Sequence, residues 1–128
     1  MNYIAHKDGD RIQTIKEHLE GTASLAQSFA EKFGKGEWGY CCGMLHDIGK
    51  YSKEFQKKIK EDTNNMVDHA TAGAQLCKKM NLSVLDYCIA GHHAGLPDYG
   101  NTAERSSLCG RYKKNRCLIK RTCNYSDK

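Results

Sequence analysis

Hydrophobic residues recur along most of this chain at the three- and four-residue intervals that place them on one face of an α-helix. The clearest series begins at Thr14, which with Glu17 has the spacing of a capping box. We predict that this helix ends near Gly34. Its apolar stripe consists of Ile15, Leu19, Ala23, Ala26, Phe29, Ala30 and Phe33. No stretch alternates convincingly with the two-residue period of a strand, so the pattern predicts an all-α protein.

The same spacing predicts further helices in the rest of the chain. They are expected at residues 37–46, at 53–61, from a cap at Asp68 to about residue 80, from a cap at Ser83 to about residue 92, and, marginally, at 105–114. Gly73 falls inside the fourth helix, where glycine costs up to ~1 kcal/mol relative to alanine. We expect a close approach between two helices to require it. Residues 1–13 are polar, with a turn at Asp8-Gly9-Asp10.

Length and charge indicate one domain followed by a basic tail. The chain has 128 residues and a net charge of +5. From Glu104 onward there are eight Lys or Arg and only two Asp or Glu, so the basic character belongs to the end. We assign residues 1–114 to the domain and 115–128 to a basic, irregular tail. This tail either holds phosphates or is simply solvated.

No apolar run approaches the roughly 18 residues that span a bilayer, and the first residues lack the hydrophobic region of a signal peptide. The chain has seven cysteines but no Cys-x-x-Cys pair. We therefore expect a cytoplasmic protein with no membrane partner and no disulfide scaffold. The cysteines at 41, 42, 77 and 88 are expected to be buried as small hydrophobes. The spacing of those at 109, 117 and 123 matches no zinc-ligand pattern.

The candidate chemistry gathers around the run Leu45-His46-Asp47-Ile48-Gly49-Lys50, at the end of the second helix. His18 lies on the border of the first apolar stripe, and His69 begins the fourth helix. His92 and His93 differ by 100° in a regular helix, and both can face one site only if the helix ends there. The Ala-Gly-Leu-Pro sequence after them indicates that it does.

Imidazole suits transition metals, and a carboxylate can bridge two of them. In a two-metal hydrolytic site the ions lie roughly 3.5–4 Å apart and hold the attacking and leaving oxygens of a phosphoryl displacement. We predict that Asp47 is the bridge between the ions. His18 and His46 would serve one ion, and His69, His92 and His93 would serve the other.

Two more residues near these motifs have an open role. Lys50 either contacts substrate phosphate or complements the carboxyl end of a helix. His6 is expected to be a surface or capping residue, so we expect His6→Ala to leave the metal content nearly unchanged.

Taken together, these residues resemble the HD superfamily of metal-dependent phosphohydrolases. The finer resemblance is to the HD nuclease domain of the CRISPR-associated helicase-nuclease of type I systems. It covers about residues 3–114 and rests on short motifs on both sides of the His-Asp pair. They are Tyr3-Ile4-Ala5-His6, Glu17-His18-Leu19, Met44-Leu45-His46-Asp47-Ile48-Gly49-Lys50, Phe55-Gln56, His69 with Gly73-Ala74, and Gly91-His92-His93-Ala94-Gly95-Leu96.

This resemblance implies a helical bundle that holds one or two divalent transition metal ions, such as Mn, Ni, Co or Fe rather than Mg. It implies cleavage of single-stranded DNA in CRISPR interference. The partners would be a helicase subunit or domain and an RNA-guided surveillance complex. Asp47 and Lys50 would be catalytic, with Lys50 at the substrate phosphate.

The chain also departs from that family, which usually runs to about twice this length and has a further aspartate on a later helix. Neither Asp98 nor Asp127 matches that residue. We therefore expect a bundle truncated at its C-terminal end, with an incomplete shell around the first ion. The apolar face left exposed would favour a homodimer.

Two other functions stay open at this point. One is an HD phosphohydrolase that acts on nucleotides or cyclic dinucleotides. The other is a truncated remnant that binds metal without activity, for which the unmatched aspartate is the argument.

Overall fold

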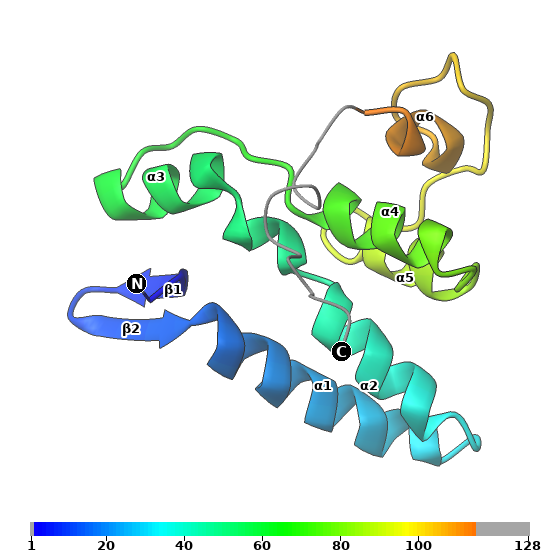
Figure 1. Ribbon diagram of the computed structural model, residues 1–128, viewed down its shortest axis with the longest axis horizontal. Coiled ribbons are helices and arrows are strands. Elements are labelled where there is room, and N and C mark those ends of the chain that lie inside the picture. The colour runs from blue at the N-terminus through cyan, green and yellow to red at the C-terminus, as the bar shows by residue number, and fades with distance from the viewer. Residues whose placement is uncertain (1, 115–128) are drawn as a thin grey trace, which may run out of the picture.

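The computed structural model describes residues 2–114 and shows a mostly helical domain, which confirms the predicted class. The elements in chain order are β1 (Ile4–Asp8), β2 (Arg11–Thr14), α1 (Ile15–Glu31), α2 (Gly36–Leu45), a 3-10 turn η1 (Ile48–Tyr51), α3 (Lys53–Glu61), α4 (Ala70–Lys79), α5 (Leu85–Gly91) and α6 (Leu108–Tyr112). Helices α1 and α2 form an antiparallel hairpin (Figure 1), and α4 and α5 pack as a second pair. The η1 turn, which joins α2 to α3, lies between these two helix pairs (Figure 1).

Local signals in the sequence place the long helices correctly. The capping box of α1 is formed, because the Thr14 hydroxyl accepts from the Glu17 amide at 3.2 Å while the Glu17 carboxylate accepts from the Thr14 amide at 2.8 Å. Helix α4 has His69 rather than Asp68 as its N-cap, although the Asp68 carboxylate one residue earlier accepts from the Thr71 amide at 3.1 Å. The helix predicted at residues 53–61 has these bounds.

The two later helices are shorter than predicted. Helix α5 begins at Leu85, after Val84, rather than from a cap at Ser83. Helix α6 contains five residues and begins after Ser107, whose hydroxyl accepts from the Gly110 amide. The residues before Ser107, which were predicted to be helical from residue 105, form turns instead. In one of them the Ser107 amide donates a hydrogen bond to the Glu104 carbonyl.

The expectation of no strand was wrong for the first residues. Strands β1 and β2 pair antiparallel on either side of the predicted turn. A two-stranded hairpin alone is marginal in water. Here it is held by Gln56 of α3, whose side-chain oxygen accepts from the Ile4 amide at 3.0 Å while its nitrogen donates to the Ile4 carbonyl at 2.9 Å. The contact spans 52 residues, so local sequence could not reveal it.

The core has two parts, and residues of η1 pack against the second one. The first consists of Ala74, Cys77, Leu85, Ile89, Ala90 and Leu108, with Cys41 and Cys42 packed against it. The second consists of Ala5, Ile15 and Leu19, with Met44, Ile48 and Tyr51 against it. Of the four cysteines expected to be buried, Cys77 is buried, Cys41 and Cys42 are half-buried, and Cys88 is exposed, so the prediction was wrong for Cys88.

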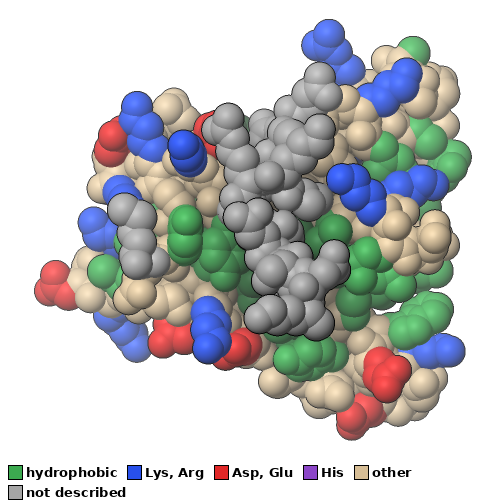
Figure 2. All heavy atoms as spheres, viewed as in Figure 1, with side chains coloured by type: hydrophobic (Ala, Val, Ile, Leu, Met, Phe, Trp, Pro, Cys, Tyr) green, Lys and Arg blue, Asp and Glu red, His purple; other side chains and the backbone are tan. Residues whose placement is uncertain are grey.

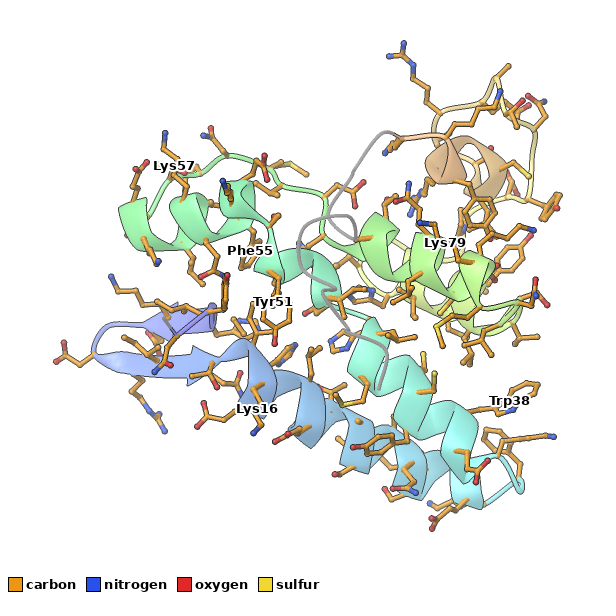
Figure 3. All side chains as sticks on the ribbon, viewed as in Figure 1. Lys16, Trp38, Tyr51, Phe55, Lys57 and Lys79 are labelled. Carbon is orange, nitrogen blue, oxygen red and sulfur yellow. The ribbon has the colours of Figure 1, made fainter. Side chains whose placement is uncertain are left out.

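The far end of the α1–α2 hairpin exposes part of its predicted apolar stripe. Phe29, Phe33 and Trp38 are all largely exposed. Trp38 lies at this end of the molecule, whereas Tyr51 and Phe55 lie near η1 (Figure 3). Apolar side chains also gather over the α1–α2 hairpin on the face seen in Figure 2. Among the described residues, no helix combines the length and apolarity that crossing a bilayer would need. The tail at 115–128, with Cys117, Cys123 and Asp127, lies outside the described residues.

Gly73 tests how α4 packs against the end of α2. A Cβ added there would lie 2.2 Å from the Leu45 carbonyl oxygen, which confirms the expected close approach. We predict that Gly73→Ala lowers the free energy of unfolding, although alanine is intrinsically the better helix former. Gly21 in α1 is the control, because a Cβ there meets nothing within 4 Å. Gly21→Ala should raise stability by roughly 0.5–1 kcal/mol. Urea denaturation measures both, and a stabilised Gly73→Ala would contradict the packing.

Candidate metal centre

The ends of several elements meet at Asp47, in the junction between α2 and η1. His46 is the last residue before the junction, and His18 approaches from α1. His69 immediately precedes α4, and His92 and His93 immediately follow α5. The five histidines predicted as ligands therefore converge on one aspartate. Side chains at helix ends are not confined to a helix face, which is why the adjacent pair at 92 and 93 can both point inward.

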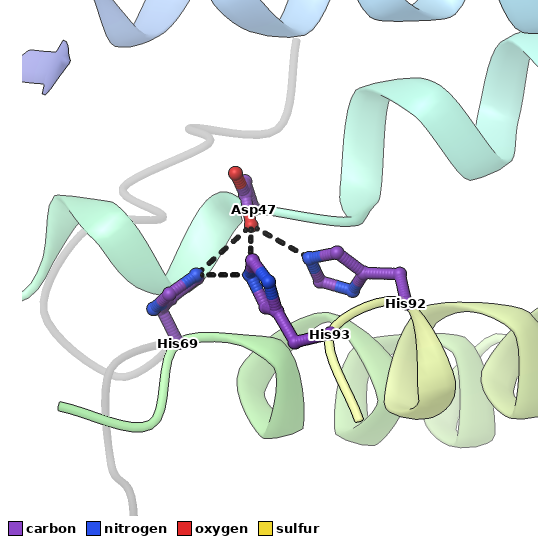
Figure 4. Close-up of side chains that lie close together, drawn as sticks. All are labelled: Asp47, His69, His92 and His93. Carbon is purple, nitrogen blue, oxygen red and sulfur yellow. Dashed lines mark hydrogen bonds and ion pairs between the residues drawn. The ribbon is translucent and has the colours of Figure 1, made fainter. Parts of the chain in front are cut away.

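The two carboxylate oxygens of Asp47 face different histidines. Oδ1 lies 3.1 Å from Nε2 of His92, 3.4 Å from Nε2 of His69 and 3.9 Å from Nε2 of His93. These three side chains surround the carboxylate in Figure 4. Oδ2 lies 2.9 Å from Nε2 of His18 and 3.3 Å from Nε2 of His46. The division into two sets is the one predicted from the sequence for a bridging carboxylate.

Backbone carbonyls fix the orientation of three of the rings. Nδ1 of His46 donates to the Gly43 carbonyl at 2.6 Å, Nδ1 of His69 to the Val67 carbonyl at 3.0 Å, and Nδ1 of His92 to the Ile89 carbonyl at 2.6 Å. A carbonyl only accepts, so Nδ1 carries a proton in all three rings, and each ring in its neutral form presents the Nε2 lone pair toward Asp47. Metal-binding histidines generally have such a partner on the second nitrogen.

Gly49 allows His69 to reach the site. A Cβ at Gly49 would lie 2.1 Å from the carbonyl oxygen of His69 and 2.7 Å from its Cα. The η1 turn therefore packs directly against the backbone just before α4. Any larger residue at position 49 would push His69 away from Asp47. This contact explains why the His-Asp-Ile-Gly-Lys run has a glycine at that position.

Asp47 is a buried anion, with 2% of its surface exposed. Burial by itself raises the pKa of its carboxyl group, but hydrogen bonds from His46, His92 and Lys50 outweigh that effect and hold the pKa far below its usual range. The carboxylate is therefore charged throughout the physiological pH range and can act as a ligand.

The histidines respond to the same surroundings in two ways. Burial lowers the pKa of His18, His69 and His93. Burial also lowers the pKa of His92, but its hydrogen bond to Asp47 and its bond to the Ile89 carbonyl raise the pKa by more. Metals bind the neutral imidazole. At neutral pH the three histidines with lowered pKa values are already in the binding form.

Lys50 is also part of the cluster, and its side chain is almost fully buried. Its Nζ lies 2.9 Å from Oδ2 of Asp47 and 3.0 Å from Nε2 of His6. His6 is exposed, as expected of a surface residue, but the sequence did not predict that it lies beside His18 and Asp47. The motif Tyr3-Ile4-Ala5-His6 was a signal for it, but the strand that carries it was missed.

The donor set fits divalent transition metals. In the described part of the chain, Asp47, His69, His92 and His93 form one group whose ligand atoms lie within 4.8 Å of one another, and His6, His18 and Asp47 form another. Imidazole nitrogens favour Fe, Co, Ni or Zn, the Asp47 carboxylate also suits Mn, and Mg prefers shells made of oxygen ligands. The residues can therefore hold a metal on either side of Asp47.

Comparison with known sequences agrees with this geometry. The profile of the HD domain matches residues 15–128. This chain belongs to the HD domain family. Members of the family are metal-dependent hydrolases.

One curated relative is an oxygenase. The chain is 29% identical over 102 residues to the (1-hydroxy-2-(trimethylamino)ethyl)phosphonate dioxygenase (glycine-betaine-forming) of Leisingera caerulea. The match covers 74% of this chain and 50% of that protein, so the HD domain described here spans about half the relative's length. No solved structure matches.

Replacing Asp47 tests its role as a shared ligand. Asp47→Asn keeps the size of the side chain and removes its charge, so we predict loss of bound metal on both sides of the carboxylate. Elemental analysis after loading with Mn²⁺ and dialysis measures the content. Glu20→Gln is the matched control, because it removes one negative charge from an exposed position on α1. Metal content that is intact in Asp47→Asn would show that Asp47 is not the bridge.

Proposed function

We propose that this HD domain is a two-metal phosphodiesterase that degrades single-stranded DNA in CRISPR interference, together with a helicase and an RNA-guided surveillance complex. The observation that carries the proposal is the position of Asp47, whose two oxygens each face their own set of imidazoles. One carboxylate between two ligand sets is the arrangement that holds a pair of ions for phosphoryl transfer. The DNA substrate and the partners come from the sequence resemblance.

The chain's residues divide the work as follows. Asp47, His18 and His46 would hold one ion, and Asp47, His69, His92 and His93 would hold the other. When bound, such ions neutralise phosphate charge and lower the pKa of water. The Oδ1 side is the more open one, because the side chain of His93 is 55% exposed, whereas those of His18 and His46 next to Oδ2 are 18% and 13% exposed. We infer that the phosphodiester approaches from the side of His93.

Lys50 remains a candidate for the substrate phosphate. Its Nζ is bound to Oδ2 of Asp47 and lies 5.5 Å from the centre of the Phe55 ring. From this position the ammonium group first balances the buried carboxylate. A lysine side chain is long and flexible, and a shift toward the His93 side would bring the charge to a bound phosphate.

The surface beside the centre suits a nucleic acid. Helix α3 carries Lys53, Lys57, Lys58 and Lys60 against Glu54 and Glu61. It adjoins the site because the Phe55 ring packs edge-on against His69 with centroids 5.3 Å apart. Lysines spaced along a helix can follow a phosphate backbone without reading sequence. This surface supports a polymeric substrate over a free nucleotide.

The curated relative favours a second candidate, oxidation of a small phosphonate. Both candidates place a phosphorus oxyanion at a histidine-rich centre. They differ in what the centre needs: hydrolysis needs a Lewis acid and water, whereas oxygenation needs a redox-active metal and O₂. The basic face of α3 has no evident role for a small substrate.

The test is incubation of the protein with labelled single-stranded DNA, duplex DNA, cyclic dinucleotides and dNTPs in the presence of Mn²⁺, Ni²⁺ or Mg²⁺. We expect fragments from single-stranded DNA alone, with Mn²⁺ or Ni²⁺ better than Mg²⁺. A parallel reaction with Fe²⁺, O₂ and a hydroxyphosphonate measures oxygen consumption.

Two variants make the result specific to this centre. Asp47→Asn should reduce cleavage to the rate without added metal, while Glu20→Gln should cleave like the wild type. Turnover of dNTPs or cyclic dinucleotides in place of DNA would overturn the proposal that DNA is the substrate. Oxygen consumption would favour phosphonate oxidation. Bound metal without turnover of any substrate would identify an inactive remnant.

A further inference from the structure

We propose that His6, on strand β1, is an additional ligand of the ion on the Oδ2 side of Asp47, which gives that ion the set His6, His18, His46 and Asp47. This inference rests on the proposed two-metal function and concerns the ion whose ligand shell the sequence left incomplete. All six histidines of the chain would then serve one centre.

The position of His6 is the first argument. Its ligand atom lies within 4.8 Å of those of His18 and Asp47. Its ring packs edge-on against the ring of His18, with centroids 4.8 Å apart. His18 in turn places Nε2 2.9 Å from Oδ2 of Asp47 and 3.2 Å from Nε2 of His46. A metal with bonds of about 2.1 Å to neighbouring imidazole nitrogens holds them about 3.0–3.4 Å apart.

The orientation of the His6 ring is the second argument. Nε2 of His6 lies 3.0 Å from Nζ of Lys50. An ammonium group has donors only, so Nε2 must be the acceptor and must carry a lone pair. His6 therefore has the same tautomer as His46, His69 and His92, and its lone pair points at a cation that Asp47 Oδ2 also contacts.

This shared position already accommodates positive charge. Nζ of Lys50 is held by Oδ2 of Asp47, Nε2 of His6 and, at 3.4 Å, the Ala5 carbonyl. The same oxygen and nitrogen atoms are suitable metal ligands. Lys50 is on a flexible stem, whereas His6 is on a strand, so a divalent ion would displace the ammonium rather than the imidazole.

The hairpin that carries His6 is fixed from both sides. Ala5 is buried in the core beside Ile15 and Leu19. Gln56 binds both backbone groups of Ile4, and its nitrogen also donates to the Lys50 carbonyl at 2.9 Å. One side chain therefore sets β1 relative to the η1 turn. Gln56 acts as a positioning residue, which gives the Phe55-Gln56 motif a role far from the His-Asp pair.

The experiment must separate a ligand from a residue that only orients Lys50. We would measure Mn²⁺ and Co²⁺ binding, by elemental analysis and by the visible absorption of Co²⁺, in the wild type, His6→Ala, Lys50→Met and the double variant. Lys7→Ala is the matched control on the same strand, and His6→Gln is a second replacement if His6→Ala fails to fold. Circular dichroism checks folding.

If His6 is a ligand, His6→Ala weakens one of the two bound ions at least tenfold, whether residue 50 is Lys or Met, and changes the Co²⁺ spectrum. Lys50→Met and Lys7→Ala should keep both ions. Unchanged affinity in His6→Ala would overturn the proposal. So would an effect that disappears in the Lys50→Met background, because His6 would then act only through Lys50.

These outcomes are independent of the substrate. If the wild type cleaves single-stranded DNA and the His6→Ala variant binds metal as well as the wild type does, only this inference is contradicted. If the His6→Ala variant loses the second ion but the wild type cleaves no DNA, only the proposed function is contradicted.

Discussion

A buried carboxylate must be compensated, and this requirement organises the domain around Asp47. An unpaired charge in a protein interior is very costly. Here imidazoles from α1, α2 and the ends of α4 and α5, together with the ammonium of Lys50, surround the carboxylate. Because these groups come from elements far apart in sequence, the compensation of one charge fixes the relative position of the helices. The same arrangement makes the carboxylate available to two metal ions.

Much of the fold could be predicted because its signals are local. The capping box at Thr14 and Glu17 set the start of α1. Gly73 indicated a close contact that the structure places at the Leu45 carbonyl. The Ala-Gly-Leu-Pro sequence after His92 and His93 indicated a helix end at which both can face the site, and the histidines were divided between the two sides of Asp47 as a bridging carboxylate. The first two of these inferences used residues within a few positions of one another, whereas the assignment of the histidines used residues from 18 to 93 and the preference of metals for imidazole.

The errors came from contacts between distant residues. Strands β1 and β2 show no alternation of apolar and polar residues, and the hairpin depends on Gln56 for its place. Because the hairpin was missed, the position of His6 beside His18 and Asp47 was not predicted, although His6 is exposed as expected. Cys88 has helical spacing with buried neighbours but lies on the exposed side of α5. Helix periodicity cannot settle a position at the edge of an apolar stripe.

The HD domain by itself does not determine the reaction. Members of the family are metal-dependent hydrolases, whereas the named activity of the relative is an oxygenation. What separates the two is the surroundings of the centre. The lysines of α3 and the partly exposed His93 favour an extended anionic substrate. The central claim is therefore that Asp47 bridges two ions at one hydrolytic centre.

Electron paramagnetic resonance during a Mn²⁺ titration of the wild-type protein tests that claim most directly. Ions bridged by one carboxylate lie about 3.5–4 Å apart and couple magnetically. We predict a stoichiometry of two ions per chain and an exchange-coupled signal when both are bound. A single ion at saturation, or two ions that keep the signal of isolated Mn²⁺, would contradict it.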